Sequence, residues 1–167
     1  MRLTPSGLWF MGRRVPVTIG ASGLTRHKAE GDRATPIGTH RVVGMYYRPD
    51  RLPPPAPWAR MIGPGDLWCD APDHPRYNHL VRAPFAASHE TMRRADPMYD
   101  IVLVTDWNYP NAQPHRGSAI FLHQWRRRGA ATAGCLAFAR SDLLWICRRI
   151  RPGTRVVIPA LAGATTA

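Results

Sequence analysis

Two residues near the middle of the second half of the chain have side chains that can do covalent chemistry together. His123 closes the apolar run SAIFLH and Cys135 opens the run GCLAFA, with a polar loop between them. A cysteine thiolate is a strong nucleophile, and a histidine close in space can generate it by taking the thiol proton. Gly134 has no side chain to block a carbonyl, so amides around Gly134 and Cys135 are candidates for an oxyanion hole. The residues alone leave two interpretations open: nucleophilic catalysis by the cysteine, or a core cysteine and an unrelated surface histidine.

The two candidates can meet only if the elements that carry them lie side by side. Runs rich in Val, Ile and aromatic residues, bounded by Gly, Asp and Pro, predict short strands. These runs are LWFMG, RRVPVTIG, THRVVGMYY, YDIVLVTDW, SAIFLH, GCLAFA and GTRVVIP. Pro16 predicts an edge position for the second of them. The expected fold is mainly β with one C-terminal helix and long loops, either a mixed β-sandwich or an open barrel.

That helix is predicted at SDLLWICRRI, with Ser141 as N-cap, Asp142 in the first turn and Cys147 on the apolar face. A second, short helix is expected in PFAASHETMRRAD, capped by Ser88. Residues 49–84 hold nine of the 17 prolines, which excludes helix there and predicts a long, extended loop. Its aromatic residues favour a packed lid over a loose linker.

Composition limits the remaining possibilities. The 167 residues, 44% of them hydrophobic, fit one domain spanning 1–167. The net charge of +12 predicts an anionic partner, such as an acidic wall polymer, nucleic acid or anionic lipid. No nucleic-acid-binding signature is present, so nucleic acid is not the expected partner. No apolar run approaches a transmembrane span, and the first residues do not resemble a secretion signal.

The three cysteines and the histidines of the middle segment raise the question of a metal. Cys69, His74, His79 and His89 match no compact zinc-ligand spacing. We therefore expect no metal.

Several motifs resemble the YkuD-type L,D-transpeptidases, bacterial cell-wall enzymes. SAIFLH followed by TAGC is similar to the family's histidine, loop and Ser/Thr-His-Gly-Cys, and GDRATPIGTH resembles its Gly-Asp/Asn-x-x-Thr-Pro-x-Gly hairpin. A compact proteobacterial branch of the family shares segments resembling LWCDAP, Tyr77-Asn78, PFAASHE and Tyr99-Asp100. The resemblance runs from about residue 7 to residue 158.

This resemblance implies a cross-linking reaction. Cys135 would attack an amide carbonyl of a peptidoglycan stem peptide, with His123 as base, and the amine of a neighbouring stem would then take the acyl group from the thioester. A main-chain carbonyl near Gln124 would hold the second imidazole nitrogen. No cofactor is implied, carbapenems would react at the cysteine, and the place of action would be the periplasm or cell wall. Substrate-lining residues are expected among Tyr77, Asn78, His89, Glu90, Asp100, Ser118, Trp125 and Thr132.

The sequence also departs from the family pattern. Ala133 replaces the histidine before Gly-Cys, Ala137 replaces an arginine or asparagine, and Gln124 stands where glycine is usual. These changes alter the walls of the site and leave the nucleophile and base in place. Most of the family makes 3,3 links between diaminopimelates, whereas the compact branch is associated with 1,3 links from the L-alanine carbonyl. The altered walls favour the second.

Three points stay open on sequence alone. The same Cys–His pair could run as a hydrolase, with water in place of the acceptor amine. The chain could instead be a non-catalytic basic module that binds wall polymer or nucleic acid. The run from Arg126 to Gly129 is either a solvated face or a site for stem-peptide carboxylates. The oligomeric state is not predicted.

Overall fold

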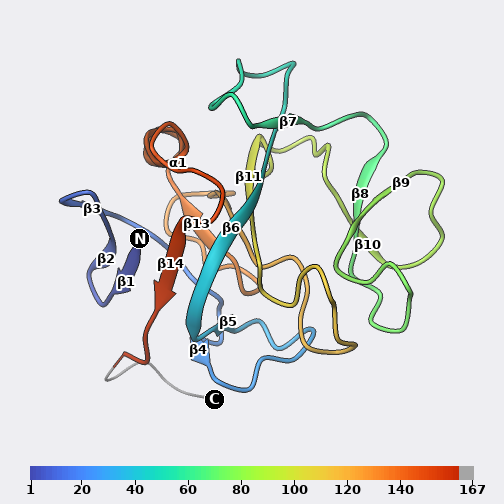
Figure 1. Ribbon diagram of the computed structural model, residues 1–167, viewed down its shortest axis with the longest axis horizontal. Helices are drawn as coiled ribbons and strands as arrows, with labels where there is room; N and C mark the ends of the chain where they lie inside the picture. Colours follow the sequence, from blue (N-terminus) through green and yellow to red (C-terminus); the bar gives the residue numbers. More distant parts are fainter. Residues whose placement is uncertain (162–167) are drawn as a thin grey trace.

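The computed structural model describes residues 1–161, and its centre is a nine-stranded mixed sheet. The strand order is β13-β12-β11-β6-β14-β1-β2-β3, with β7 paired to β6, and the long β6 runs through the middle of the molecule (Figure 1). The bounds are β1 (Arg2–Thr4), β2 (Gly7–Phe10), β3 (Arg13–Val15), β6 (Gly38–Tyr47), β7 (Arg60–Met61), β11 (Ile101–Thr105), β12 (Phe121–Gln124), β13 (Leu136–Phe138) and β14 (Arg155–Ile158).

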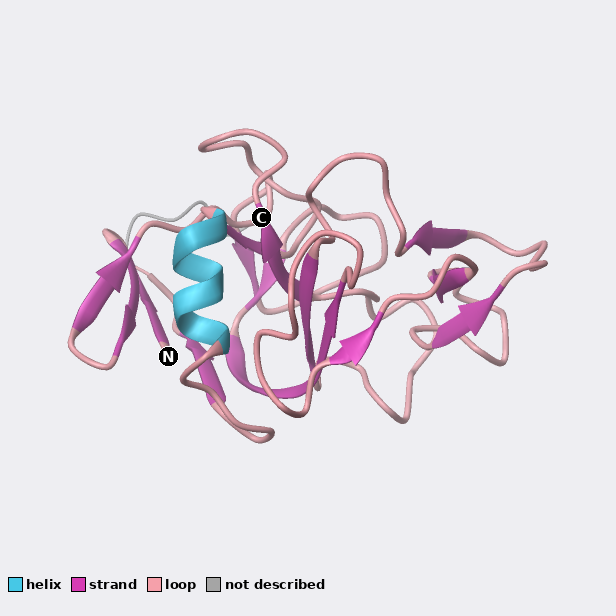
Figure 2. Ribbon diagram, turned by 90° about the horizontal axis from the view of Figure 1, so that it is seen from above, coloured by secondary structure: helices cyan, strands magenta, loops and turns pink. Residues whose placement is uncertain are grey.

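Two small sheets and one helix complete the described elements. β8 (Asp66–Cys69), β9 (Leu80–Arg82) and β10 (His89–Thr91) form a three-stranded sheet in the order β10-β8-β9. β4 (Leu24–Thr25) pairs with β5 (Thr35–Pro36). The helix is α1 (Arg140–Cys147). In Figure 1 and in Figure 2, α1 lies on one side of the central strands and the sheet of β8, β9 and β10 lies on the other.

Side-chain alternation along the central strands divides the core in two. In β11, Ile101 and Leu103 join a cluster that includes the buried face of α1, whereas Val102 and Val104 join a second cluster with Trp68 of β8. Successive residues of a strand point to opposite faces, so one strand can serve both clusters. The prediction of a mainly β, layered fold with one C-terminal helix is confirmed, and Cys147 is a core residue of that helix.

Two local expectations are wrong. The segment expected to form a helix capped by Ser88 instead forms β10, whose residues pair with β8, for example Glu90 with Trp68; tertiary pairing overrides local propensity there. The helix α1 begins at Arg140, and its N-cap is Ala139 without a side-chain cap, so Ser141 is inside the first turn. Asp142 is in that turn as expected and pairs with Arg13 at 2.5 Å.

The proline-rich segment is more ordered than a simple loop. Residues 49–84 contain β7, β8 and β9, and Trp68 within it is almost fully buried. The edge position predicted from Pro16 is confirmed, because β3 is the last strand of the large sheet and ends at Val15. Across residues 1–161, no helix reaches the length and apolarity that a membrane crossing requires.

Candidate active site

His123 and Cys135 lie on the same face of the large sheet. β12 and β13 are parallel neighbours, with His123 opposite Ala137. Cys135 precedes Ala137 by two residues, and a period of two keeps both on one face. All three residues line one cavity of about 600 Å³. The sheet register therefore brings the thiol and the imidazole to a common cavity.

The thiol of Cys135 is buried and held by two backbone groups. Its Sγ donates to the carbonyl of Ala119 at 3.0 Å and accepts from the amide of Phe121 at 3.4 Å. Burial raises the pKa of Cys135 to about 12, against a smaller lowering by the Phe121 amide. At neutral pH the resting side chain is therefore a thiol and needs a base to become a nucleophile.

The imidazole of His123 is in the form that such a base requires. Its Nδ1 lies 2.7 Å from the carbonyl oxygen of Gln124. Because a carbonyl only accepts hydrogen bonds, Nδ1 carries the proton and Nε2 keeps its lone pair. Burial lowers the pKa of His123 to about 4, so the ring is neutral. The ring of Tyr99 packs edge-on against it, with centroids 5.4 Å apart.

This neutral resting pair predicts a distinctive pH dependence of thiol labelling. Only the thiolate reacts with iodoacetamide, so the labelling rate at Cys135 should rise about tenfold for each pH unit between pH 7 and pH 10. Peptide mapping would separate Cys135 from Cys69 and Cys147. A rate that already levels off below pH 8 would show a preformed thiolate–imidazolium pair and contradict the burial argument.

The turn before Cys135 is fixed by two threonines. Thr132 Oγ1 accepts from the amide of Gly134 at 3.1 Å and donates to the carbonyl of Cys135 at 2.7 Å. Thr35 Oγ1 donates to the carbonyl of Gly134 at 2.7 Å. Gly134 has φ +137°, and a Cβ there would lie 2.9 Å from the carbonyl oxygen of Ala34. A glycine is required at this position, but its amide is already used within the turn.

The rest of the cavity lining contains charged side chains of both signs and several alanines. Carboxylates come from Glu30, Asp70 and Glu90, and guanidinium groups from Arg94, Arg126 and Arg127. The small lining residues are Ala119, Ala130, Ala131, Ala133 and Ala137. Alanine stands at 133 and 137, where the resemblance leads one to expect larger polar residues.

The expected substrate-lining residues divide into two groups. Glu90, Ser118 and Thr132 line the cavity. The others lie outside its lining and have structural partners instead. Asp100 is buried between Arg51 and Arg140, at 2.6 and 2.7 Å.

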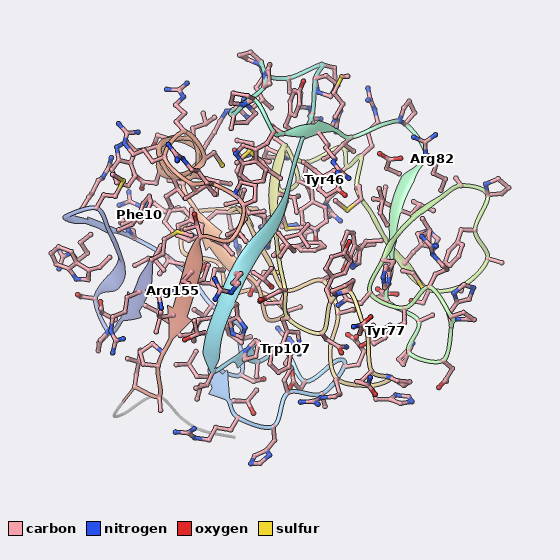
Figure 3. The ribbon with its side chains drawn as sticks, in the orientation of Figure 1. Phe10, Tyr46, Tyr77, Arg82, Trp107 and Arg155 are labelled. Carbon is pink, nitrogen blue, oxygen red and sulfur yellow. The ribbon has the colours of Figure 1, made fainter. Side chains whose placement is uncertain are left out.

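Three more of the expected substrate-lining residues, and Gln124, also have partners within the protein. The indole of Trp125 donates to Thr18 at 2.8 Å, and the exposed His89 contacts the carbonyl of Ala87. Tyr77, labelled in Figure 3, is buried and donates its hydroxyl to Glu30. Gln124 contributes its main-chain carbonyl to His123, and its side-chain amide donates to Pro97.

The side-chain amide of Asn78 holds several segments around the site together by hydrogen bonds. Its Oδ1 accepts from the Trp68 indole at 2.9 Å and from the amide of Ala119 at 2.9 Å. Its Nδ2 donates to the carbonyls of Trp107 and Asn108. Through Ala119, whose carbonyl accepts a hydrogen bond from the Cys135 thiol, this amide helps to fix the position of that thiol.

Removing this amide should destabilise the fold. In Asn78→Ala the buried Trp68 indole and the backbone groups of Ala119, Trp107 and Asn108 lose their partner, which should lower the free energy of unfolding by about 2–4 kcal/mol. Urea denaturation measures the change. The exposed Asn111→Ala is the matched control and should stay within about 0.5 kcal/mol of the parent protein. Equal stability of the two variants would refute the supporting role.

Sequence reasoning missed three charged residues of the cavity. Glu30 directly precedes the GDRATPIG motif and Asp70 directly follows Cys69 in LWCDAP, so both lay next to motifs already singled out. Nothing in the sequence distinguishes Arg94 from its neighbour Arg93. In residues 1–161, no group of three or more His, Cys, Asp or Glu side chains is arranged to hold a metal ion, and all three cysteines are free.

Comparison with known proteins gives one match. The YkuD family profile, described as the L,D-transpeptidase catalytic domain, matches residues 5–158. The searches of curated proteins and of solved structures gave no match. The matched range contains every residue that lines the cavity.

Proposed function

This chain belongs to the YkuD family of L,D-transpeptidase catalytic domains, and from that membership we propose that it cross-links peptidoglycan stem peptides through a thioester on Cys135. Family membership supports action on peptidoglycan in general. One observation carries the finer proposal. The buried thiol and a neutral imidazole, oriented by the Gln124 carbonyl, line the same cavity. A base-activated cysteine nucleophile needs a neutral imidazole close to its thiol, and the shared cavity supports that role for His123.

In the first half of the proposed reaction, a donor stem acylates the enzyme. His123 Nε2 takes the proton of Cys135 as Sγ attacks an amide carbonyl of the donor, and a tetrahedral oxyanion forms. The oxyanion then collapses, the C–N bond breaks, and the leaving nitrogen takes the proton back from His123. The amide of Gly134 already bonds to Thr132, so we assign the oxyanion contact to the amide of Cys135.

In the second half, an amine from a neighbouring stem attacks the thioester. The new C–N bond forms as the C–S bond breaks, and the Cys135 thiolate recovers its proton through His123. Water would give hydrolysis in place of transfer, so the outcome depends on how well the cavity holds an amine beside the thioester. The arginines at 126 and 127 line the cavity and suit the carboxylates of stem peptides.

For the type of link, we propose the 1,3 form, made from the L-alanine carbonyl of the donor, over the 3,3 form. The support is the cavity wall, in which Ala133 and Ala137 replace larger polar residues of the common pattern and lie next to Cys135. The smaller alanine side chains leave more space for a donor stem that continues beyond the reacting carbonyl. Action in the periplasm or at the cell wall follows from the substrate, because the family acts on peptidoglycan.

The test is mass spectrometry of muropeptides after reaction of the purified protein with isolated sacculi. The proposal predicts new dimers whose fragmentation shows an L-alanine–diaminopimelate bond, and none with Cys135→Ala. Dimers with a diaminopimelate–diaminopimelate bond would correct the link type alone. Shortened stems without dimers would replace transfer by hydrolysis. An effect on the wall that persists in Cys135→Ala would favour a non-catalytic binding module.

A further inference from the structure

The carboxylates of the cavity are unusual in this molecule because they lack close cations. The chain has 23 Lys and Arg residues against 11 Asp and Glu. Within residues 1–161, seven of these acidic residues pair with Lys or Arg, Asp73 contacts His115, and three have no such partner: Glu30, Asp70 and Asp106. Two of those three line the cavity. The third cavity carboxylate, Glu90, has the longest pair of the described set, 3.9 Å to Arg94.

The guanidinium group of Arg94 is itself paired mainly with another carboxylate, that of Asp96. Arg94 makes two hydrogen bonds to Asp96, at 2.9 and 2.8 Å. Glu90 otherwise receives only a long contact from the Tyr99 hydroxyl, at 3.5 Å. Arg126 and Arg127 also line this cavity, but neither pairs with one of its three carboxylates, so each carboxylate keeps a charge that no described side chain closely balances.

Asp70 gives a second, independent sign that this charge has an external partner. Its Oδ1 is buried and has no hydrogen-bond partner within the described residues. A buried carboxylate oxygen without a partner is costly in a folded protein. A ligand that donates hydrogen bonds into the cavity would supply one.

The three residues come from separate segments that the fold brings to one cavity. Asp70 follows β8, and its amide bonds to the carbonyl of Ser88 just before β10. Glu90 is in β10, and Glu30 is fixed by the hydroxyl of Tyr77. Burial raises the pKa of Glu90, and the charges of Asp70 and Glu30 raise it further, while Arg94 and the Tyr99 hydroxyl lower it.

We propose that Glu30, Asp70 and Glu90 form the acceptor side of the cavity, where they bind the ammonium group of the incoming amine, and that Glu90 takes one of its protons. An amine in water at neutral pH is an ammonium ion and cannot attack a carbonyl. The three carboxylates do not form a metal-binding group, so an organic cation is the fitting ligand. This inference rests on the proposed transfer reaction.

The proton balance of this step is complete. The ammonium gives its first proton to the Glu90 carboxylate, and the neutral amine attacks the thioester on Cys135. The nitrogen gives a second proton to His123 as the C–S bond breaks, and His123 passes it to the departing thiolate. The third hydrogen stays on the new amide, and Glu90 releases its proton to water.

The experiment separates acylation from transfer. A purified tetrapeptide or pentapeptide muropeptide serves as donor and a tripeptide muropeptide as acceptor. Rapid-quench intact mass gives the rate of acyl-enzyme formation, and chromatography gives the ratio of cross-linked to hydrolysed donor. In Glu90→Gln this ratio should fall at least tenfold, and at least fivefold more than acylation falls. Asp70→Asn should lower the ratio about three- to tenfold and provides the test if Glu90→Gln does not fold.

The control variant is Asp73→Asn, which removes the same charge from an aspartate whose side chain is 88% exposed; its ratio should match that of the parent protein. A pH series adds a readout for the proton transfer. In Glu90→Gln the ratio should climb steeply between pH 7 and pH 9, as the amine loses its proton in solution, and in the parent protein it should change little.

A ratio unchanged within twofold in both Glu90→Gln and Asp70→Asn would overturn this inference while leaving the thioester reaction intact. An equal fall of acylation and transfer would overturn it too, since the carboxylates would then affect the reaction of the donor and not the binding of the acceptor amine. Absence of any acyl-enzyme in the parent protein would instead overturn the proposed function, and the inference with it.

Discussion

Replacing Cys135 by alanine should abolish cross-linking, with product formation reduced at least about 10⁴-fold, to the level of the buffer. No other thiol can take its place. Cys147 belongs to α1 and is buried in the core cluster on the opposite face of the sheet, and Cys69 does not line the cavity. Dimer formation from purified muropeptides, followed by liquid chromatography and mass spectrometry, measures the loss.

Two control variants separate loss of the Cys135 thiol from the loss of any buried thiol and from a change of shape. Cys69→Ala also removes one buried thiol and should retain the parent rate. Cys135→Ser preserves the shape but should stay inactive, because a serine hydroxyl is a far weaker acid than a thiol. Near-parent rates in a folded Cys135→Ala protein would remove the nucleophile from this account.

Replacing His123 by glutamine should lower the rate of acyl-enzyme formation by about 10²–10⁴-fold at pH 7. With the pKa of Cys135 raised to about 12, only about 10⁻⁵ of the thiol is ionised at that pH. Without a base, the reaction depends on that fraction. Raising the pH should therefore restore activity in the variant, about tenfold for each unit up to pH 10, where the fold tolerates it.

The exposed His89→Gln is the matched control for this substitution and should leave acylation unchanged. Rapid-quench mass spectrometry with a muropeptide donor gives the rates for both variants. A His123→Gln protein that acylates at the parent rate, or whose rate does not respond to pH, would show that another group deprotonates the thiol.

The sequence predicted the parts of this site that depend on local pattern. Strand runs ending at His123 and beginning at Cys135 were readable from their apolar residues, and a period of two predicts which face each side chain takes once two strands pair. What the residues alone did not reveal was that β12 and β13 are parallel neighbours with His123 opposite Ala137.

Features that depend on contacts between distant parts of the chain could not be predicted from the sequence. The helix expected after Ser88 is the strand β10, because its backbone pairs with β8, about twenty residues earlier. Asp100 was expected near the substrate and is instead buried between two arginines. Glu30 and Asp70 carry no signal of their own and gain meaning only where the fold brings them to one cavity.

The most direct test of the central claim is where a covalent acyl group attaches. A carbapenem offers a reactive acyl carbonyl, and the account predicts that the intact mass of the purified protein rises by one equivalent of the drug. Digestion should locate the adduct on the peptide that contains Cys135, and the adduct should be missing from Cys135→Ala. An adduct on Cys69, or one equivalent still bound by Cys135→Ala, would contradict the account.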